Sequence, residues 1–127
     1  MKDRAIELWK RAKQAIETSR HTLEHGDFDA AASRAYYAAF YAVSALFCLE
    51  GRTFKKHTAI EAAVHRDLIN TGRWPKAIGP EWRSLQRLRD IGDYGGVERV
   101  SFEQARDAIV KASEILDLVH QTCPDFT

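Results

Sequence analysis

The hydrophobic positions of this chain recur at the three- and four-residue steps typical of amphipathic helices. The first such stretch covers residues 3–25, and Gly26 supplies a C-terminal stop. The second covers residues 28–50, where Asp27 or Asp29 can cap the first turn. The pattern therefore predicts two long antiparallel helices that are joined by a short turn.

Three further helices are predicted. One covers residues 57–70, and the next covers residues 80–94 with Pro80 in its first turn. The last begins after Ser101, which forms a capping box with Gln104. No repeat and no strong strand pattern interrupts the series. We predict one all-α domain over residues 1–127, an antiparallel four-helix up-and-down bundle with an additional short helix.

The second predicted helix is apolar on nearly every face, so every face needs a cover. In a domain of this size, we expect part of that cover to come from a second copy of the chain, which predicts a homodimer. Aromatic side chains gather on the same helix. If these rings are exposed, they suit base stacking, and if they are covered, they belong to the core or to an interface. The sequence leaves both possibilities open. The residues are Tyr36, Tyr37, Phe40 and Tyr41.

Charge and hydropathy narrow the function classes. The chain has 19 basic and 18 acidic residues, so no overall positive field indicates a nucleic-acid-binding protein, although a local basic cleft is compatible with these numbers. The first residues lack the apolar core of a signal peptide. The longest uncharged run, residues 35–49, is too short and too polar for a membrane span. We expect a cytoplasmic protein with no membrane partner.

The clearest candidate site lies in the predicted helix over residues 80–94. Arg89 falls on its apolar face, and Asp93 follows one turn later, so the two side chains are predicted to pair. Burial of such a pair costs several kcal/mol per ion unless its geometry is excellent. We therefore predict that this face lines a cleft, with a structural ion pair as the alternative. The apolar positions around Arg89 are Trp82, Leu85, Leu88 and Gly92.

Other polar groups carry weaker signals. His21 and His25 lie one turn apart but lack the glutamate of a zinc-protease motif, so a solvated face is the favoured interpretation. His57, Glu61 and His65 share a helix face, either as an exposed amphipathic surface or as ligand contacts. The sequence has no glycine-rich phosphate loop and no serine nucleophile elbow. We expect no metal and no cofactor.

Four segments carry a family resemblance: DAAASRAYYAAFYA at 29–42, KHT at 56–58, LRDIGDY at 88–94 and SFEQA at 101–105. Together they resemble HEPN (higher eukaryotes and prokaryotes nucleotide-binding) domains, in an uncharacterised subgroup with an arginine-to-Asp-Tyr signature. The resemblance covers nearly the whole chain. It implies a helical bundle that dimerises, so that arginine-containing motifs of both subunits meet in one cleft. Many members are partners of a minimal nucleotidyltransferase in toxin–antitoxin pairs.

Active members of that family are metal-independent ribonucleases whose motif is an arginine, four to six residues, and then a histidine. Arginine holds phosphate bidentately, and histidine exchanges protons near neutral pH. In this chain Asp93 stands in the place of the histidine, and Arg87 rather than Arg89 has the family's spacing. The ribonuclease motif is therefore not intact, and the sequence does not decide whether the chain is an enzyme.

The first hypothesis is a binding module in which Arg87, Arg89 and His57 contact a nucleotide or RNA phosphate, or which docks a nucleotidyltransferase partner. The alternative is a ribonuclease toxin with a remodelled site of Arg89, Asp93 and Tyr94, aided by a histidine of the third helix. In some toxins of the family, the partner nucleotidyltransferase modifies a tyrosine near this position, and the spacing of Tyr94 differs by one residue. A further alternative is a structural homodimeric scaffold.

Overall fold

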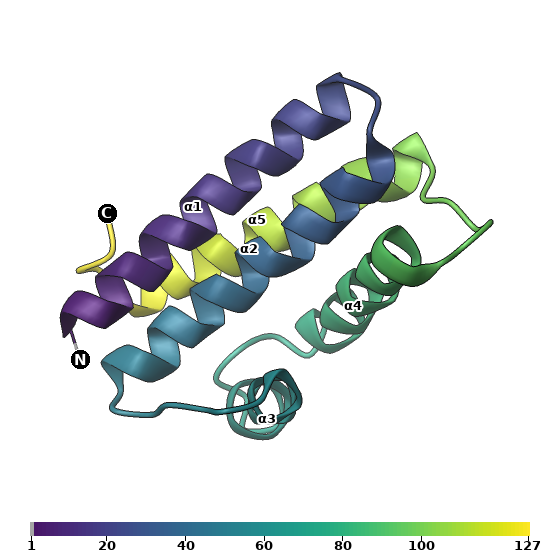
Figure 1. The fold of residues 1–127 in the computed structure, drawn as a ribbon. Coiled ribbons are helices and arrows are strands. Elements are labelled where there is room, and N and C mark those ends of the chain that lie inside the picture. Colours follow the sequence, from purple (N-terminus) through teal and green to yellow (C-terminus); the bar gives the residue numbers. More distant parts are fainter. Residues whose placement is uncertain (1) are drawn as a thin grey trace.

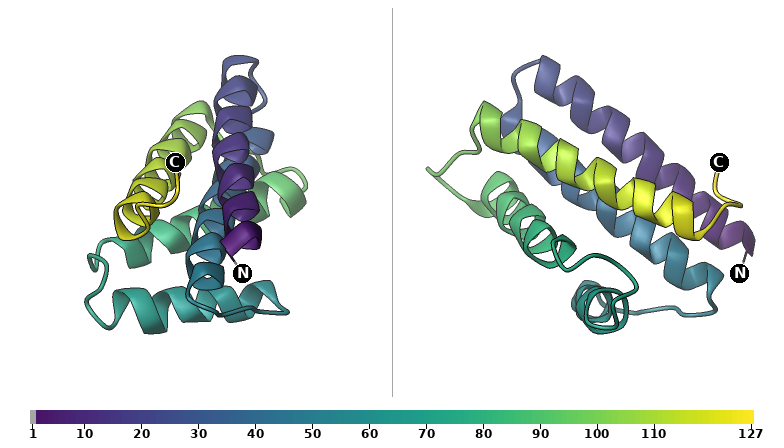
Figure 2. Two further views of the ribbon diagram at one scale, coloured as in Figure 1. Left: turned by 90° about the vertical axis from the view of Figure 1, so that its left-hand side faces the viewer. Right: turned by 180° about the vertical axis from the view of Figure 1, so that it is seen from behind.

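The computed structural model describes residues 2–127, and within that range it contains helices and connecting loops but no strand. The long helices α1, α2, α4 and α5 alternate in direction, and the short segment of α3 and η1 lies across one end of α2 (Figures 1 and 2). This confirms the predicted up-and-down bundle with an additional short helix. The elements are α1 (Lys2–Glu24), α2 (Phe28–Leu49), α3 (His57–Ala63), the π-helix η1 (Val64–Ile69), α4 (Ile78–Tyr94) and α5 (Phe102–Thr122).

Helix α2 is the centre of the fold. It packs against α1, α4 and α5, and each of its residues is buried or partly buried. The chain's own helices therefore cover most of α2. Tyr37, Tyr41 and Ser44 share one face of α2 and are only partly buried. The expectation that a second copy covers part of α2, and with it the homodimer, stays a prediction.

The helix ends follow the sequence signals closely. Asp27 caps α2 by accepting a hydrogen bond of 3.1 Å from the Ala30 amide. Ser101 and Gln104 form both hydrogen bonds of the predicted capping box at the start of α5. Helix α4 begins at Ile78, two residues earlier than predicted, so that Pro80 stays in its first turn. These caps satisfy backbone amides that a helix start leaves without an intrahelical partner.

A close approach between α2 and α4 fixes the position of α4. At Gly92 a Cβ atom would lie 2.6 Å from the carbonyl oxygen of Asp29, closer than a side chain tolerates. The Asp29 carboxylate also holds the loop after α4, since it accepts a 2.8 Å hydrogen bond from the Val100 amide and pairs with Arg99. Glycine at this point of α4 therefore allows the helix to lie directly against α2.

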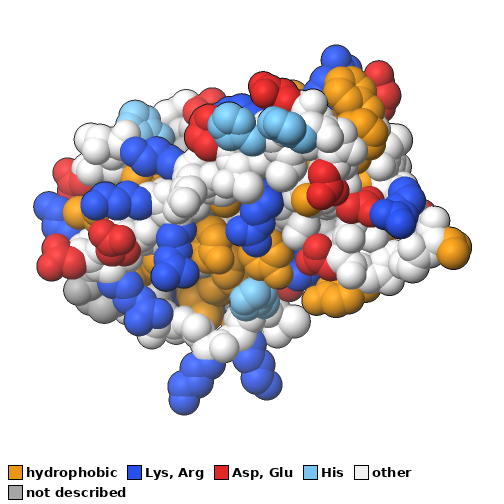
Figure 3. Space-filling view, turned by 45° about the horizontal axis from the view of Figure 1, so that its top comes forward, with side chains coloured by type: hydrophobic (Ala, Val, Ile, Leu, Met, Phe, Trp, Pro, Cys, Tyr) orange, Lys and Arg blue, Asp and Glu red, His pale blue; other side chains and the backbone are white. Residues whose placement is uncertain are grey.

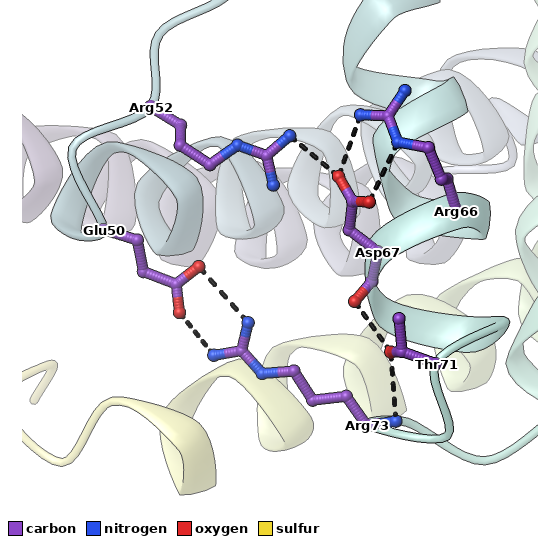
Figure 4. A network of polar contacts seen from close by, with 6 residues as sticks. All are labelled: Glu50, Arg52, Arg66, Asp67, Thr71 and Arg73. Atoms are coloured by element: carbon purple, nitrogen blue, oxygen red, sulfur yellow. Dashed lines mark hydrogen bonds and ion pairs between the residues drawn. The ribbon is translucent and has the colours of Figure 1, made fainter.

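A polar network anchors the loop between α2 and α3 (Figure 4). Asp67 of η1 accepts hydrogen bonds of 2.8 Å from Arg52 and from Arg66, and Arg73 pairs with Glu50 at the end of α2. The hydrogen bonds from Arg66 and Arg52 lower the pKa of Asp67 to about 2, so the carboxylate stays charged in ordinary buffers. The network ties the start of the loop to η1 and to the segment between η1 and α4.

Candidate functional site

Basic and aromatic side chains of α2, α3 and α4 meet around Tyr37. The guanidinium carbon of Arg34 lies 4.9 Å from the centroid of the Tyr37 ring, and that of Arg89 lies 5.7 Å from it. The His57 ring centroid is 6.3 Å away. We call these residues, together with Tyr36, the Tyr37 cluster. It brings together Arg89 and His57, which the sequence suggested from separate helices.

Arg89 reaches the cluster from the α2-facing side of α4. Its Nη1 donates a hydrogen bond of 3.1 Å to the hydroxyl of Tyr37, and its guanidinium carbon lies 4.6 Å above the Tyr36 ring. The side chain is 16% exposed, so it is neither free in solvent nor sealed in the core. A guanidinium over an aromatic face gains from the negative potential of the ring. The two tyrosines thus fix both the position and the plane of the guanidinium.

The charge of Arg89 persists despite its partial burial. Burial opposes the charge, but the hydrogen bond to Tyr37 and the interactions with Tyr36 and Asp90 raise the pKa of Arg89 above its ordinary value. Its Nε lies 3.0 Å from the Asp90 carboxylate as an ion pair but makes no hydrogen bond with any residue in 2–127. A guanidinium has five N–H donors, so several remain for an additional acceptor.

Tyr36 is held from behind by α3. Its hydroxyl donates a hydrogen bond of 2.7 Å to Glu61, and Gln86 of α4 donates to the same carboxylate oxygen. Burial, followed by the hydrogen bond to Glu61, raises the pKa of Tyr36 far above its ordinary value. The phenol therefore stays neutral. The network connects three helices directly beneath the Arg89 guanidinium.

His57 lies on the outer side of the cluster at the first residue of α3. Its ring centroid is 4.2 Å from that of Phe40, and the residue is exposed. Its ring is therefore accessible to solvent or to a ligand. His57 and Arg89 share Tyr37 as a neighbour, so an anion held by the guanidinium would have an imidazole on the other edge of the cluster.

The predicted ion pair between Arg89 and Asp93 is wrong. Asp93 is exposed, and Arg89 forms its ion pair with Asp90 instead. The spacing of Asp93 allows a contact along the helix, but the rings of Tyr36 and Tyr37 draw the guanidinium toward α2. The prediction that Arg89 lies on an otherwise apolar face is confirmed, because Trp82, Leu85 and Leu88 are buried.

Two further candidates lie outside the Tyr37 cluster. Arg87 is exposed and forms no ion pair within residues 2–127. Tyr94 is 77% exposed at the end of α4. Together with Asp93, these residues lie on the solvent side of α4, whereas Arg89 faces α2. The residues suggested for a remodelled catalytic site therefore do not converge with Arg89.

The remaining polar candidates are dispersed. His65 lies on η1, where burial, and next the charge of Arg83, lower its pKa. His21 and His25 are exposed at the end of α1. Within residues 2–127, no group of three histidine, cysteine, aspartate or glutamate residues is arranged to hold a metal ion. No helix within residues 2–127 is both long enough and apolar enough to cross a membrane.

Sequence reasoning missed two parts of the cluster. Arg34 precedes Tyr37 by three residues, so the helical spacing already placed them on one face. The contact between Tyr36 and Glu61 joins residues 25 positions apart, and no local pattern could reveal it. The first omission was avoidable, and the second required the tertiary structure.

Comparison with known proteins agrees with the fold and the sequence pattern. A model of the HEPN domain family matches residues 5–122. A UPF0332 protein of Thermotoga maritima is 34% identical over 126 residues, which cover 98% of this chain and 96% of the relative. A protein of Methanocaldococcus jannaschii named "Putative toxin MJ0142" is 24% identical over 110 residues, 87% of this chain and 75% of that protein.

The fold is shared with a solved structure. The crystal structure of TT1696 from Thermus thermophilus superposes with a TM-score of 0.79, covering 93% of this chain and 97% of the other. The two sequences are 20% identical, so this likeness concerns the fold alone.

Proposed function

Because this chain belongs to the HEPN domain family, we propose that it is a binding module that recognises a phosphate group of a nucleotide or RNA at the Tyr37 cluster. One observation carries the proposal: Arg89 presents a charged guanidinium that two tyrosines hold in place and that retains unused N–H donors. Guanidinium groups match the geometry of phosphate oxygens, and a fixed side chain loses less entropy on binding.

The neighbours of Arg89 support the same function. The guanidinium carbon of Arg34 lies 4.9 Å from the Tyr37 ring centroid, and Arg34 has no ion pair within residues 2–127. His57 is exposed and also neighbours Tyr37. Asp90 is the carboxylate paired with the Nε of Arg89, and its side chain is exposed. Two arginines and a histidine thus surround one tyrosine, which favours an anionic ligand.

The experiment compares Arg89→Gln with Arg106→Gln by calorimetric titration of ADP. Arg106 is an exposed arginine of α5 outside the cluster, so its substitution changes the net charge equally. Loss of charged hydrogen bonds predicts about ten-fold or greater weakening for Arg89→Gln and little change for Arg106→Gln. Equal affinities in the wild type and both variants contradict the proposal. An Arg87→Gln variant tests separately whether that exposed arginine contributes.

A ribonuclease toxin is the second candidate. It is supported by the proximity of His57 and Arg89, which share Tyr37 as a neighbour, and by the relative whose name includes the word toxin. Expression of the chain alone then arrests growth and cleaves RNA, and Arg89→Gln or His57→Gln abolishes both effects. Harmless expression with intact RNA excludes this candidate and leaves the binding module.

A minimal nucleotidyltransferase partner and a homodimer complete the proposal, as the family resemblance implies. Co-expression with such a partner should give a complex that survives size-exclusion chromatography. Sedimentation of the isolated chain measures the homodimer independently. If the chain is a monomer and binds ADP, the phosphate site is supported, and a binding cleft built from two subunits is excluded.

A further inference from the structure

Two neighbouring grooves extend from the Tyr37 cluster over the surface formed by α1 and α2. The first, of about 240 Å³, lies between the start of α1, the second half of α2 and the loop before α3. The second, of about 390 Å³, lies between the middle of α1 and the first half of α2. Tyr41 lines both grooves. Figure 3 shows hydrophobic side chains in a hollow whose rim carries lysine, arginine and histidine side chains.

The charges that line these grooves have one sign. Six lining residues are lysine or arginine, and none is aspartate or glutamate. Within residues 2–127, only Arg52 of the six has an ion pair, with Asp67. Such segregation is notable in a chain with nearly equal numbers of acidic and basic residues. The five unpaired cations are Arg4, Arg11, Arg34, Lys55 and Lys56.

Aromatic surface alternates with these charges. Tyr41 is partly buried, and its hydroxyl has no hydrogen-bond partner within residues 2–127 although its ring packs 6.1 Å from Phe40 and 6.2 Å from Tyr37. His57 adds a ring at the edge of the first groove. Unpaired cations beside accessible rings are the features by which proteins hold single-stranded nucleic acids, because phosphates contact the cations and bases stack on the rings.

The length of the surface excludes a single nucleotide as its full occupant. Lining residues of α1 extend from Arg4 to Thr18, which at a rise of 1.5 Å per residue is about 21 Å. A stacked strand carries one phosphate per roughly 3.4 Å, so several nucleotides are needed to cover this distance. Arg89 lines neither groove, so a nucleotide whose phosphate lies at Arg89 would leave most of this length unoccupied.

We propose that the two grooves bind a single-stranded nucleic acid, whose phosphates lie along the unpaired cations and one of whose bases stacks on Tyr41. The proposal rests on the proposed phosphate site, which receives one phosphate of the same strand. Arg34 belongs both to the second groove and to the Tyr37 cluster, and His57 belongs both to the first groove and to the cluster. The strand therefore passes from one groove to the other beside the cluster.

Fluorescence anisotropy with labelled oligonucleotides of about 12 nucleotides, within the range of known single-strand sites, tests the proposal. Separate titrations with RNA and with DNA of the same sequence show which of the two nucleic acids the grooves bind more tightly. The groove variants are Lys55→Gln/Lys56→Gln, Arg11→Gln and Tyr41→Ala. The matched control is Lys13→Gln/Lys76→Gln, which removes two unpaired cations that lie outside both grooves. Circular dichroism establishes that each variant is folded.

We expect the wild type to bind at least one of the two oligonucleotides, and the groove cation variants to bind it more weakly with a salt dependence reduced by about 0.7 per lost phosphate contact. Tyr41→Ala should weaken binding about five-fold or more, while the control stays unchanged. The same groove variants should bind ADP as the wild type does, whereas Arg89→Gln weakens both ligands. This difference separates a failure of the grooves from a failure of the phosphate site.

Three results overturn the proposal. Absence of oligonucleotide binding at low salt by a folded wild type excludes it directly. If Tyr41→Ala leaves the oligonucleotide affinity unchanged and the cation variants lose heparin binding as well, the grooves form a general polyanion surface, because heparin has no bases to stack. If the groove variants retain full oligonucleotide affinity and Arg89→Gln loses ADP, only the phosphate site remains.

Discussion

Arg89 of α4 donates a 3.1 Å hydrogen bond from Nη1 to the hydroxyl of Tyr37 on α2, across 52 positions of sequence. The contact directs the guanidinium toward α2 rather than along its own helix. It also explains why Arg89 is tolerated on an apolar face, since aromatic rings and a hydroxyl replace part of its hydration. The relationship between these two residues is the basis of the proposed phosphate site.

Removal of the Tyr37 hydroxyl tests that relationship. Tyr37→Phe keeps the ring but removes the hydrogen bond, so the free energy of unfolding should fall by about 1 kcal/mol. Urea unfolding measures this change. Tyr41→Phe is the matched control, because the Tyr41 hydroxyl has no hydrogen-bond partner within residues 2–127. A control that loses as much stability as Tyr37→Phe contradicts the interpretation.

The hydrogen bond from Tyr36 to Glu61, which lies beneath Arg89, is expected to contribute more to the free energy of unfolding than the hydrogen bond from Arg89 to Tyr37. Tyr36→Phe removes the hydroxyl that donates to the partly buried Glu61, leaving the carboxylate with Gln86. We expect a loss of about 1–3 kcal/mol in the free energy of unfolding, because a partly buried charged acceptor loses a donor. In the Glu61→Gln background, the same substitution should cost less, since the acceptor is no longer charged. Equal losses in both backgrounds would show that Glu61 is not responsible.

Gly92 provides a test of the packing of α4. Gly92→Ala places a Cβ atom 2.6 Å from the Asp29 carbonyl oxygen, and overpacking of this kind costs about 1–3 kcal/mol. Gly79→Ala lies in the same helix, but the nearest atom to its Cβ is 3.8 Å away, so a gain of about 0.5–1 kcal/mol is expected there. Thermal unfolding of the two variants should therefore move in opposite directions. A common direction would contradict the close approach.

The Asp67 network predicts a dependence of stability on pH. The pKa of Asp67 is lowered to about 2 in the folded chain by its hydrogen bonds from Arg66 and Arg52. A lowered pKa stabilises the fold above the unfolded value near 4, and the contribution is lost as the pH falls from about 4 toward 2. Asp67→Asn should thus unfold at a lower temperature than the wild type at pH 7, and the difference should disappear by about pH 2. A difference that grows with acid contradicts this account.

The sequence predicted those parts of the fold that depend on local chemistry. Asp27 and Ser101 cap helices where their side chains can reach the first-turn amides, and such reach is fixed by a few residues. Arg89 was recognised as anomalous for a similar reason, because a charge interrupts the apolar stripe of one helix. Its ion-pair partner was assigned wrongly, because Arg89 pairs with the adjacent Asp90. Its hydrogen bond to Tyr37 on another helix leaves no trace in local spacing. Tyr37 competes successfully with Asp93 because it offers both a hydroxyl and a ring.

The covering of α2 illustrates the same limit on a larger scale. An apolar helix must be covered, but the pattern does not say by what. The structure supplies α1, α4 and α5 as the cover for most of α2, and cover of its partly buried face by a second copy stays a prediction. The two grooves were equally hidden from the sequence, because Arg4, Arg11 and Lys55 become neighbours of Tyr41 only when α1 and the loop before α3 fold onto α2.

The most direct test of phosphate recognition by Arg89 is the salt dependence of oligonucleotide affinity in the wild type and in Arg89→Gln. The wild type should bind with an affinity that falls as salt rises, because each phosphate contact releases counterions. Arg89→Gln should bind more weakly at low salt, and the slope of log Kd against log salt should decrease by about 0.7. Identical affinities and identical slopes in the two folded proteins would contradict the account.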